Sequence, residues 1–471
     1  MGKRIIFYAV LLVLISSCND KIPSDHVIQT SFRDLDEIRE RGKLVAITDY
    51  NSTNYFIYNG EPMGFHFELL EDFATHLGVR LELIIENDIE KAFAKLNAGD
   101  VDIVAMGLTV NSERLAQLTL SDPFNETRQI LVQRKPANWR SLTEDKLNSL
   151  LIRDHLDLAG KVIYVQKGSA YVQRLRHIQH EIGDTIYAVE LPYEVEGLIS
   201  LVAKGEIEYT ICDENIAMVN RNYFSNIDVR TPLSFRQNQA WGMRKLRSEG
   251  LAESLNSWLK EYKSSGDYIM AYAKYFKNSR SEKIQKSEYF TNNTGRISPW
   301  DELIQKYSDS ISWDWRLLAA LVYQESRFDP YATSGAGAHG LMQVLPTTGE
   351  HFGINVFTSP EQNMKAGIMY IRWLERMFES KVEDEEERMR FVLASYNAGP
   401  GHVLDAMRLA AKNGSNSSIW YGNVDEYILK KAEPAYYNDP EVQHGRFKGV
   451  ETVNFVTDIL ERFDHYKNLT K

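Results

Sequence analysis

The pattern of apolar residues changes at a polar segment that spans residues 277–296. Before this segment, strand-like runs such as Leu44–Thr48 alternate with helical stretches such as Gly64–Gly78. Such alternation is typical of βα units built around a mostly parallel sheet. After the segment, helical periodicity dominates to the end of the sequence, and the segment itself has the polar composition of a linker. The sequence therefore predicts two dissimilar units joined by residues 277–296.

A second set of strand-like and helical runs indicates that the first unit has two lobes. These runs begin after Lys161. A chain of 471 residues is too long for one ordinary core, which also favours several structural units. We expect a two-lobed α/β module like a periplasmic binding protein over residues 41–276 and a mainly α domain over residues 297–471. Within the module, the expected boundaries place residues 41–133 and 235–276 in lobe 1 and residues 134–234 in lobe 2.

Residues 1–17 have the pattern of a secretory signal peptide. Lys3 and Arg4 precede an apolar run of about a dozen residues, which is too short to span a bilayer stably. Ile15–Cys18 resembles the bacterial lipobox, in which the cysteine is lipidated and becomes the first residue of the mature chain. We therefore predict lipidation of Cys18 and a tether over residues 18–40. The alternative is an ordinary cleaved signal in which Cys18 stands by chance.

Charge and cysteine content exclude several classes of protein. The formal net charge of −11 gives no basic surface of the kind that nucleic-acid-binding proteins carry. The sequence has 2 cysteines and neither a CxxC nor an HExxH motif, so we predict no metal site and no cofactor. Lipidation of Cys18 would leave Cys212 without a disulfide partner. We expect Cys212 to be a buried strand residue, because no histidine neighbours it in sequence to activate a catalytic thiol.

One carboxylate lies on an otherwise apolar helical face. Glu325 follows the run Leu317–Val322 at the three-and-four spacing that places it on the same face. A charge there costs free energy unless it is paired, neutralised or used. Burial also raises the pKa of a carboxyl toward the range of a general acid, so we expect Glu325 to be catalytic. The alternative is that Glu325 extends to solvent or pairs with Arg316 or Arg327.

Two later motifs supply groups suited to holding a sugar chain. The first is "GLMQ" at Gly340–Gln343, where glycine lets the backbone approach a ligand and the glutamine amide both donates and accepts hydrogen bonds. The second is "YNAG" at Tyr396–Gly399, which places a ring beside an amide at an expected helix end. Each motif alone is compatible with a helix-capping loop. Their order after Glu325 makes the combination specific.

On these motifs, the region from about Ile297 onward resembles the lysozyme-like domain of soluble-type lytic transglycosylases. The whole chain resembles members of that family that are lipoproteins and carry a solute-binding-protein-like module. The resemblance implies non-hydrolytic cleavage of the β-1,4 bond between N-acetylmuramic acid and N-acetylglucosamine, which leaves 1,6-anhydro ends. Glu325 would protonate the leaving oxygen and then accept the proton of the 6-hydroxyl, so one carboxylate suffices. The implied glycan-binding residues are Ser326, which would support Glu325, and Gly340, Met342, Gln343, Tyr396 and Asn397.

The motif "ETVNFV" departs from the family pattern. Phe455 stands where the family usually has tyrosine, and Val453 where many relatives have arginine. Loss of the tyrosine hydroxyl removes a hydrogen bond worth about 1 kcal/mol. Two alternatives therefore stay open: a non-catalytic peptidoglycan-binding sensor, and a lysozyme-type hydrolase in which water attacks. The hydrolase would need a second acid, and none is evident, since Asp329 lies beside Pro330 at the expected helix end.

The α/β module resembles amino-acid-binding solute-binding proteins around Gly107–Phe124. Arg114 falls where such proteins grip a ligand carboxylate, and Asp213 where they pair with its amino group. The alternative is that Arg114 and Asp213 form a structural ion pair in a module that binds nothing. We expect an amino-acid or muropeptide effector, and covalent linkage of the module to the helical domain suggests the hypothesis that the effector regulates cleavage. The lipobox-like sequence and the implied substrate together predict lipid anchoring on the periplasmic face of the outer membrane. The implied effector-binding residues are Tyr55, Thr109, Arg114, Ser169 and Asp213.

Overall fold

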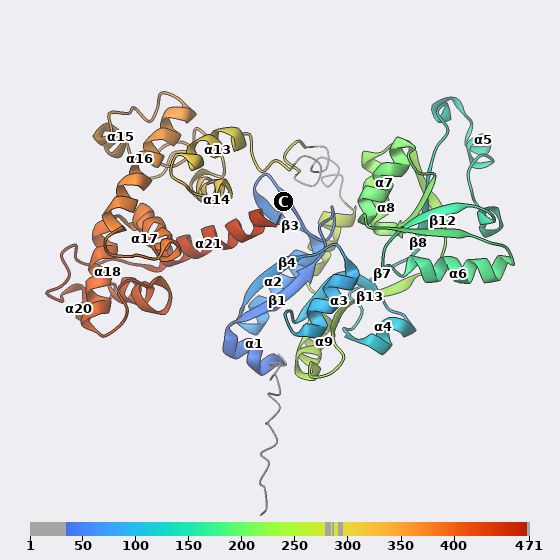
Figure 1. Ribbon diagram of the computed structural model, residues 1–471, viewed down its shortest axis with the longest axis horizontal. Coiled ribbons are helices and arrows are strands. Elements are labelled where there is room, and N and C mark those ends of the chain that lie inside the picture. The colour runs from blue at the N-terminus through green and yellow to red at the C-terminus, as the bar shows by residue number, and fades with distance from the viewer. Residues whose placement is uncertain (1–33, 278–283, 285–286, 291–294, 469–471) are drawn as a thin grey trace, which may run out of the picture.

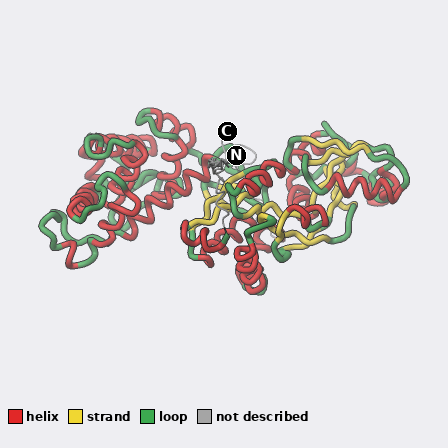
Figure 2. The backbone as a smooth tube through the Cα atoms, turned by 60° about the horizontal axis from the view of Figure 1, so that its bottom comes forward, coloured by secondary structure: helices red, strands yellow, loops and turns green. Residues whose placement is uncertain are grey.

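The computed structural model describes residues 34–277, 284, 287–290 and 295–468. Cys18 and the predicted signal peptide lie outside these ranges. Two α/β lobes and one helical domain follow one another, and lobe 1 lies between the other two bodies in both views (Figures 1 and 2). Figure 2 shows the strands confined to the two lobes. Within the described ranges, no helix has both the length and the apolar character needed to cross a bilayer.

Lobe 1 is built on a mixed sheet with the strand order β4-β1-β5-β13-β6 and with β7 paired to β13. Its central strand β1 runs parallel to β4 and β5 and is buried over five of its six residues, as expected for a strand covered on both faces. The strands are β1 (Lys43–Thr48), β4 (Arg80–Ile85), β5 (Ile103–Thr109), β6 (Leu118–Leu120), β7 (Asn125–Thr127) and β13 (Gln237–Arg244). The helices are α1 (Leu35–Arg41), α2 (Phe65–Leu77), α3 (Ile89–Ala98), α4 (Ser112–Gln117), α9 (Glu249–Tyr262), α10 (Gly266–Tyr272) and the π-helix η3 (Ala273–Lys277).

Lobe 2 is a separate sheet with the order β10-β9-β11-β8-β12. Cys212 is buried in β11, which confirms the expectation from sequence. The strands are β8 (Gln129–Arg134), β9 (Val162–Gln166), β10 (Tyr187–Leu191), β11 (Tyr209–Asp213) and β12 (Ile227–Pro232). The helices are η1 (Trp139–Ser141), α5 (Glu144–Asn148), η2 (His155–Leu158), α6 (Tyr171–Ile182), α7 (Val195–Lys204) and α8 (Glu214–Tyr223).

Three expected boundaries differ from the structure. Strand β8 pairs with β11 and β12, so the chain enters lobe 2 before residue 129 rather than after residue 133. The predicted tether over residues 18–40 includes the start of α1, whose Ile38 is buried in the core of lobe 1. In the predicted linker, Phe290 is buried against Phe56, with ring centroids 5.3 Å apart. These segments pack on lobe 1 because they carry apolar side chains among polar neighbours.

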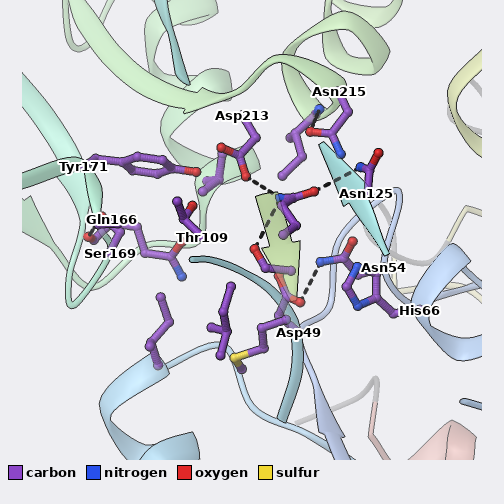
Figure 3. A pocket seen from close by; sticks show the side chains of 18 of the residues that line it. Asp49, Asn54, His66, Thr109, Asn125, Gln166, Ser169, Tyr171, Asp213 and Asn215 are labelled. Atoms are coloured by element: carbon purple, nitrogen blue, oxygen red, sulfur yellow. Dashed lines mark hydrogen bonds between the residues drawn. The ribbon is translucent and has the colours of Figure 1, made fainter. Parts of the chain in front are cut away.

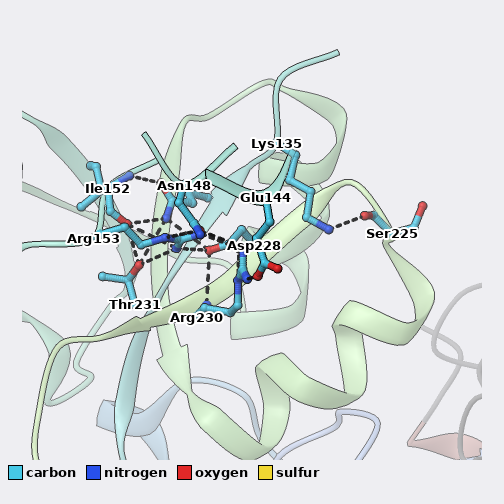
Figure 4. A network of polar contacts seen from close by, with 10 residues as sticks. Lys135, Glu144, Asn148, Ile152, Arg153, Ser225, Asp228, Arg230 and Thr231 are labelled. Atoms are coloured by element: carbon cyan, nitrogen blue, oxygen red, sulfur yellow. Dashed lines mark hydrogen bonds and ion pairs between the residues drawn. The ribbon is translucent and has the colours of Figure 1, made fainter. Parts of the chain in front are cut away.

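A polar network ties the outer end of lobe 2 together (Figure 4). Asp228 on β12 accepts hydrogen bonds from Arg153 and Arg230, and Arg230 also pairs with Glu144 at the start of α5. Burial alone would raise the pKa of Asp228, but the hydrogen bonds from the two arginines outweigh it and lower the pKa. The network is fully paired with charges of opposite sign, so we interpret it as structural.

The helical domain surrounds one long buried helix, α14. Asp314 caps its start by accepting from the backbone N–H of Arg316, and its end is marked by Arg327, whose φ is 52°. Every residue from Leu317 to Tyr323 is buried. The helices are α13 (Asp301–Asp309), α14 (Trp315–Ser326), α15 (Pro346–His351), α16 (Pro360–Phe378), α17 (Glu385–Ala398), α18 (Pro400–Lys412), η4 (Trp420–Val424), α19 (Asp425–Lys430), α20 (Pro434–Tyr437) and α21 (Val450–Lys467).

Lobe 1 contacts the helical domain through a hairpin made of β2 (Phe56–Tyr58) and β3 (Glu61–Met63). Gly60 in its turn has a φ of 80°, and its carbonyl accepts a 2.8 Å hydrogen bond from the Tyr466 hydroxyl of α21. A Cβ atom at Gly60 would lie 2.5 Å from the Phe328 ring and 2.7 Å from the Tyr323 ring. The hairpin therefore fits closely against α21 and the end of α14, and only glycine fits at this position.

Candidate active site and ligand cleft

A groove crosses the helical domain and brings together four of the residues singled out in the sequence. Glu325 comes from the end of α14, Gln343 from the loop before α15, and Tyr396 and Asn397 from the end of α17. The start of α21 supplies the opposite wall. The other residues that line the groove are Gln324, Ser334, Ala336, Ala338, Leu345, Leu429, Ala432, Lys448, Gly449, Val450, Glu451, Asn454, Phe455 and Asp458.

Glu325 is half-buried and has no hydrogen-bond or ion-pair partner among the described residues. Arg316, one of the two expected alternatives, instead pairs with Asp314 at 2.6 Å. Arg327 makes no ion pair with Glu325 in the described structure. Burial without a compensating cation raises the pKa of Glu325 to about 8. The carboxyl is therefore mostly protonated at neutral pH and can donate a proton.

Tyr396 and Asn397 are fixed by hydrogen bonds to neighbouring segments. The Tyr396 hydroxyl donates to the carbonyl of Met342 at 2.8 Å. Burial, with a contribution from the nearby Glu325 charge, raises the pKa of Tyr396 well above its usual value. The Asn397 carbonyl oxygen Oδ1 accepts from the Thr452 hydroxyl at 2.7 Å, which links α17 to α21. These bonds hold both walls of the groove at a fixed separation near Glu325.

Gln343 presents a hydrogen-bond acceptor to the groove. Its φ is 45°, and its amide nitrogen Nε2 donates to the carbonyls of Ala332 and Gly340, both at 3.0 Å. Two carbonyl acceptors require the NH₂ group on that side, so the amide orientation is determined. The oxygen Oε1 is left to accept from a ligand hydroxyl or acetamido N–H.

Three residues expected to bind glycan lie beneath the groove instead of lining it. Met342 is fully buried against α16, so its side chain cannot touch a ligand in the groove. The Ser326 hydroxyl donates to the carbonyls of Val322 and Leu341, at 3.1 and 2.8 Å. Gly340, with a φ of 76°, has the Asn363 amide 2.6 Å from where a Cβ atom would stand. The structure assigns all three to holding the loop that carries Gln343.

The groove also contains residues that the sequence analysis did not assign to it. Leu345 and Val450 are apolar rim residues with 41% and 60% of their surface exposed. Asp458 is an exposed second carboxylate on the groove and accepts a 3.2 Å hydrogen bond from Gln324. Phe455 forms part of the wall and is 6% exposed. Only Phe455 had a signal in the sequence, its motif, because the others lie on loops or on a helix face shared by many exposed residues.

A second site is the cleft between the two lobes, with a cavity volume of about 70 Å³. Thr109, Arg114, Ser169 and Asp213 all line it, and Figure 3 shows three of them, Thr109, Ser169 and Asp213, around the same space. Tyr55 does not line it. Tyr55 is fully buried just before β2, where it packs into the core of the helical domain, and its hydroxyl bonds to His465 Nδ1 of α21 at 2.9 Å.

Arg114 and Asp213 form no ion pair with each other in the described structure, which contradicts the structural-pair alternative. Arg114 Nη2 donates to the Gly168 carbonyl of lobe 2 at 2.9 Å, and the guanidinium lies 4.4 Å above the Phe93 ring. Asp213 Oδ2 accepts from Gln239 at 2.8 Å. Burial raises the pKa of Asp213 to about 7, partly offset by the Gln239 hydrogen bond. Neither Arg114 nor Asp213 therefore has an oppositely charged partner among the described residues.

In the part of the chain that the structure describes, no group of three or more His, Cys, Asp or Glu side chains is placed to hold a metal ion.

Comparison with known proteins agrees with this two-site architecture. Residues 302–419 match the model of the transglycosylase SLT domain, and residues 43–278 match that of bacterial extracellular solute-binding proteins, family 3. The membrane-bound lytic murein transglycosylase F of Desulfosudis oleivorans is 33% identical over 438 residues, which cover 93% of this chain and 92% of that protein. The chain belongs to the membrane-bound lytic murein transglycosylase F family. The transglycosylase F of Photobacterium profundum is 29% identical, over 97% of this chain and 85% of that protein.

Membership of the transglycosylase F family confirms the expected fold class and function. The protein is a multidomain lytic transglycosylase that acts on peptidoglycan. Its membership of this membrane-bound family indicates that it is a membrane-associated periplasmic enzyme. The non-catalytic sensor is not favoured. A structure of the P235GK mutant of ArgBP from T. maritima is similar over 52% of this chain and 99% of its own, with 23% identity and a TM-score of 0.44.

Proposed function

We propose that Glu325 is the one acid and base of the transglycosylase reaction. The observation that carries this proposal is a half-buried carboxyl with a pKa of about 8 and no partner in the described structure. In the first step, Glu325 gives its proton to the glycosidic oxygen and the bond from that oxygen to C1 of N-acetylmuramic acid breaks. In the second, the 6-hydroxyl oxygen attacks C1 and its proton passes to the Glu325 carboxylate. The enzyme regains its proton and no water is consumed.

The groove residues position the glycan for this reaction. Gln343 Oε1 accepts a hydrogen bond from the sugar, Asn397 offers its amide nitrogen, and the Tyr396 ring packs beside the reacting sugar. Support comes from their shared lining of the groove and from the hydrogen bonds that fix each of them. Such fixed geometry lowers the entropy cost of bringing the 6-hydroxyl to C1.

The test is digestion of purified peptidoglycan by the full-length protein in detergent, with mass spectrometry of the products. We expect anhydro-muropeptides, which are lighter by one water than hydrolysis products. They should be lost with Glu325→Gln and kept with Glu302→Gln, an exposed acid on α13. Hydrated ends that disappear with Asp458→Asn would instead assign a lysozyme-type hydrolase with Asp458 as the second acid. Unchanged products with Glu325→Gln would exclude Glu325.

We also propose that the interlobe cleft binds an amino acid or a muropeptide and regulates cleavage. The match to a solute-binding family and the unpaired Arg114 and Asp213 support ligand binding. The contact of Gly60 with Tyr323, two residues before Glu325, offers a path from lobe 1 to α14. Cleavage rates should change on ligand addition, and Arg114→Ala should abolish the change without altering the basal rate. Equal rates with and without a bound ligand would exclude regulation.

Membrane attachment is proposed to occur through lipid on Cys18, on the periplasmic face of the outer membrane. The lipobox-like sequence Ile15–Cys18 and the family name support this placement. Metabolic labelling with a fatty acid should mark the wild-type protein but not Cys18→Ser, and fractionation should find only the wild type with outer-membrane lipids. A labelled Cys18→Ser protein would place the anchor elsewhere.

A further inference from the structure

The interlobe cleft has more negative than positive groups. Its charged lining consists of Asp49, Asp213 and Arg114. Asp49 follows β1 of lobe 1 and Asp213 ends β11 of lobe 2, so the two carboxyls reach the cleft from different lobes (Figure 3). One guanidinium cannot balance both carboxyls once a ligand carboxylate also occupies it. The cleft therefore has room for positive charge from a ligand.

Asp213 has an oxygen with no partner. The residue is 6% exposed, and while Oδ2 accepts from Gln239, Oδ1 is buried without a hydrogen bond in the described structure. The Gln239 amide cannot reorient to donate to Asp213 Oδ1, because its nitrogen also donates to the Gly107 carbonyl at 3.2 Å and its oxygen accepts from Asn125 at 3.0 Å. A buried carboxylate oxygen without a donor is costly, and an ammonium group in the cleft would satisfy it.

Asp49 is held only by neutral donors. Its oxygens accept from Asn54 at 2.7 Å and Asn51 at 2.6 Å, and it forms no ion pair within the described residues. Burial raises the pKa of Asp49 to about 6, although the two asparagines lower it in part. Asparagine donors fix the orientation of this carboxyl without neutralising it. A second cation of the ligand would do so.

Among the described residues, no other group near the cleft supplies the positive charge that would balance both carboxyls. His66 lines the cleft, but burial lowers its pKa to about 3, so it is neutral. Glu196 of α7 adds negative charge near Asp49 and is engaged by Ser52 and Asn220. Lys167 is exposed and pairs with Glu90 at 2.8 Å, outside the cleft lining.

We propose that the cleft selects an amino acid with one carboxylate and a second, side-chain cation, as in lysine, ornithine or arginine. This proposal rests on the proposed ligand-binding function of the module. The α-carboxylate lies on Arg114, Thr109 and Ser169. The α-ammonium lies on Asp213, and the side-chain cation on Asp49. An uncharged side chain would leave one buried carboxyl uncompensated, which disfavours binding.

The test is calorimetric titration of the full-length protein in detergent with L-lysine and with L-norleucine, which has the same four-carbon side chain without the ammonium. We expect L-lysine to bind at least ten-fold more tightly, because a buried charge-assisted hydrogen bond is lost with L-norleucine. Asp49→Asn should bring the ratio close to one. Glu126→Gln, an exposed acid on β7 outside the cleft, should leave the ratio unchanged.

Titration at pH 7 in buffers of different ionisation heat gives a second readout. An ammonium beside Asp213 lowers the pKa of that carboxyl, so L-lysine binding should release protons, and Asp213→Asn should abolish the release. Equal affinities for lysine, norleucine and glutamine would overturn the charge selectivity but leave an amino-acid-binding module. Tighter binding of meso-diaminopimelate than of lysine would overturn the single-carboxylate assignment and favour the diamino acid of the peptidoglycan stem. No binding of any of these by protein that still makes anhydro products would overturn this inference and the proposed amino-acid ligand of the module, but not the enzyme.

Discussion

At pH 7, replacing Glu325 with glutamine should stabilise the folded enzyme although it removes the proposed acid of the reaction. The pKa of Glu325 is about 8 in the folded protein and near 4.5 in an unfolded chain. The folded state therefore has to keep a proton that the unfolded chain releases. Each pKa unit is worth about 1.4 kcal/mol of unfolding free energy, so the interval from pH 4.5 to pH 7 gives about 3 kcal/mol. Because the group is only half-buried, we expect the variant to gain about 2 kcal/mol of unfolding free energy.

The sign of the pH dependence follows from the raised pKa. The contribution of Glu325 to stability is fully present below pH 4.5 and is lost as the pH rises toward 8. Glutamine does not titrate, so the advantage of Glu325→Gln should be near zero at pH 4.5 and should grow up to pH 8. The exposed control Glu302→Gln should show no such growth.

The assay has to separate the helical domain from the two lobes, because a multidomain chain does not unfold in one step. The protein is unfolded in urea and labelled by short hydrogen-exchange pulses at one fixed pH. Mass spectrometry of peptides from α14 then gives the unfolding free energy of the domain that carries Glu325. A variant that is no more stable than wild type at pH 8, or whose advantage does not depend on pH, would refute the account. Glu325 would then be compensated, and the physical basis for its role as an acid would be gone.

Three further predictions follow from the same structure. The kcat/KM for peptidoglycan cleavage should fall ten-fold per pH unit above about pH 8 as Glu325 ionises, and a flat profile between pH 7 and 10 would contradict this. Gly60→Ala should loosen the contact between lobe 1 and the helical domain, and this loosening should be seen as faster proteolysis. Gly183→Ala is the control, because Gly183 has a similar positive φ but a Cβ atom there would have no neighbour within 4 Å. Equal effects of the two substitutions would mean that backbone strain, and not the contact, causes the change. Lys431→Met should cost about 1.5–3 kcal/mol in urea unfolding because the buried carboxylate of Asp405 loses one of its two cationic partners, Arg408 being the other. Lys430→Met, at an exposed pair, is the comparison.

The sequence predicted the fold class because periodicity reports burial directly. The alternation before residue 277 and the helical pattern after residue 297 correspond to the two lobes and the helical domain. The lobe boundary was wrong by a few residues, since β8 reads as one more strand of the first set and only its pairing with β11 and β12 places it in lobe 2. Pairing partners are set by tertiary structure, which a local pattern does not contain.

The candidate sites were predictable to the extent that a motif fixes side-chain direction. The position of Glu325 could be argued from helix spacing alone. Met342 could not, because a loop has no regular period, and the structure turns this side chain into the core while the neighbouring Gln343 faces the groove. Tyr55 was misplaced for a related reason: it packs into the core of the helical domain, and a contact between domains is not visible in a local sequence pattern. Asp458 lies on an exposed helix face where many acids would fit the same pattern.

The groove and the cleft both use a carboxyl without a cation, and the two sites respond to pH in opposite directions. In the groove, Glu325 keeps its raised pKa because no cation among the described residues pairs with it, so catalysis by the proposed mechanism requires the protonated form and should be lost above about pH 8. In the cleft, the proposed cationic ligand would bind the ionised form of Asp213, whose pKa without ligand is about 7, so binding should weaken as the pH falls below 7. An enzyme regulated through the cleft should therefore lose its ligand progressively as the pH falls and lose its activity as the pH rises. Exchange of Asp213 for asparagine should weaken ligand binding and make it insensitive to pH near 7, and it should leave the loss of activity at high pH, set by Glu325, where it is.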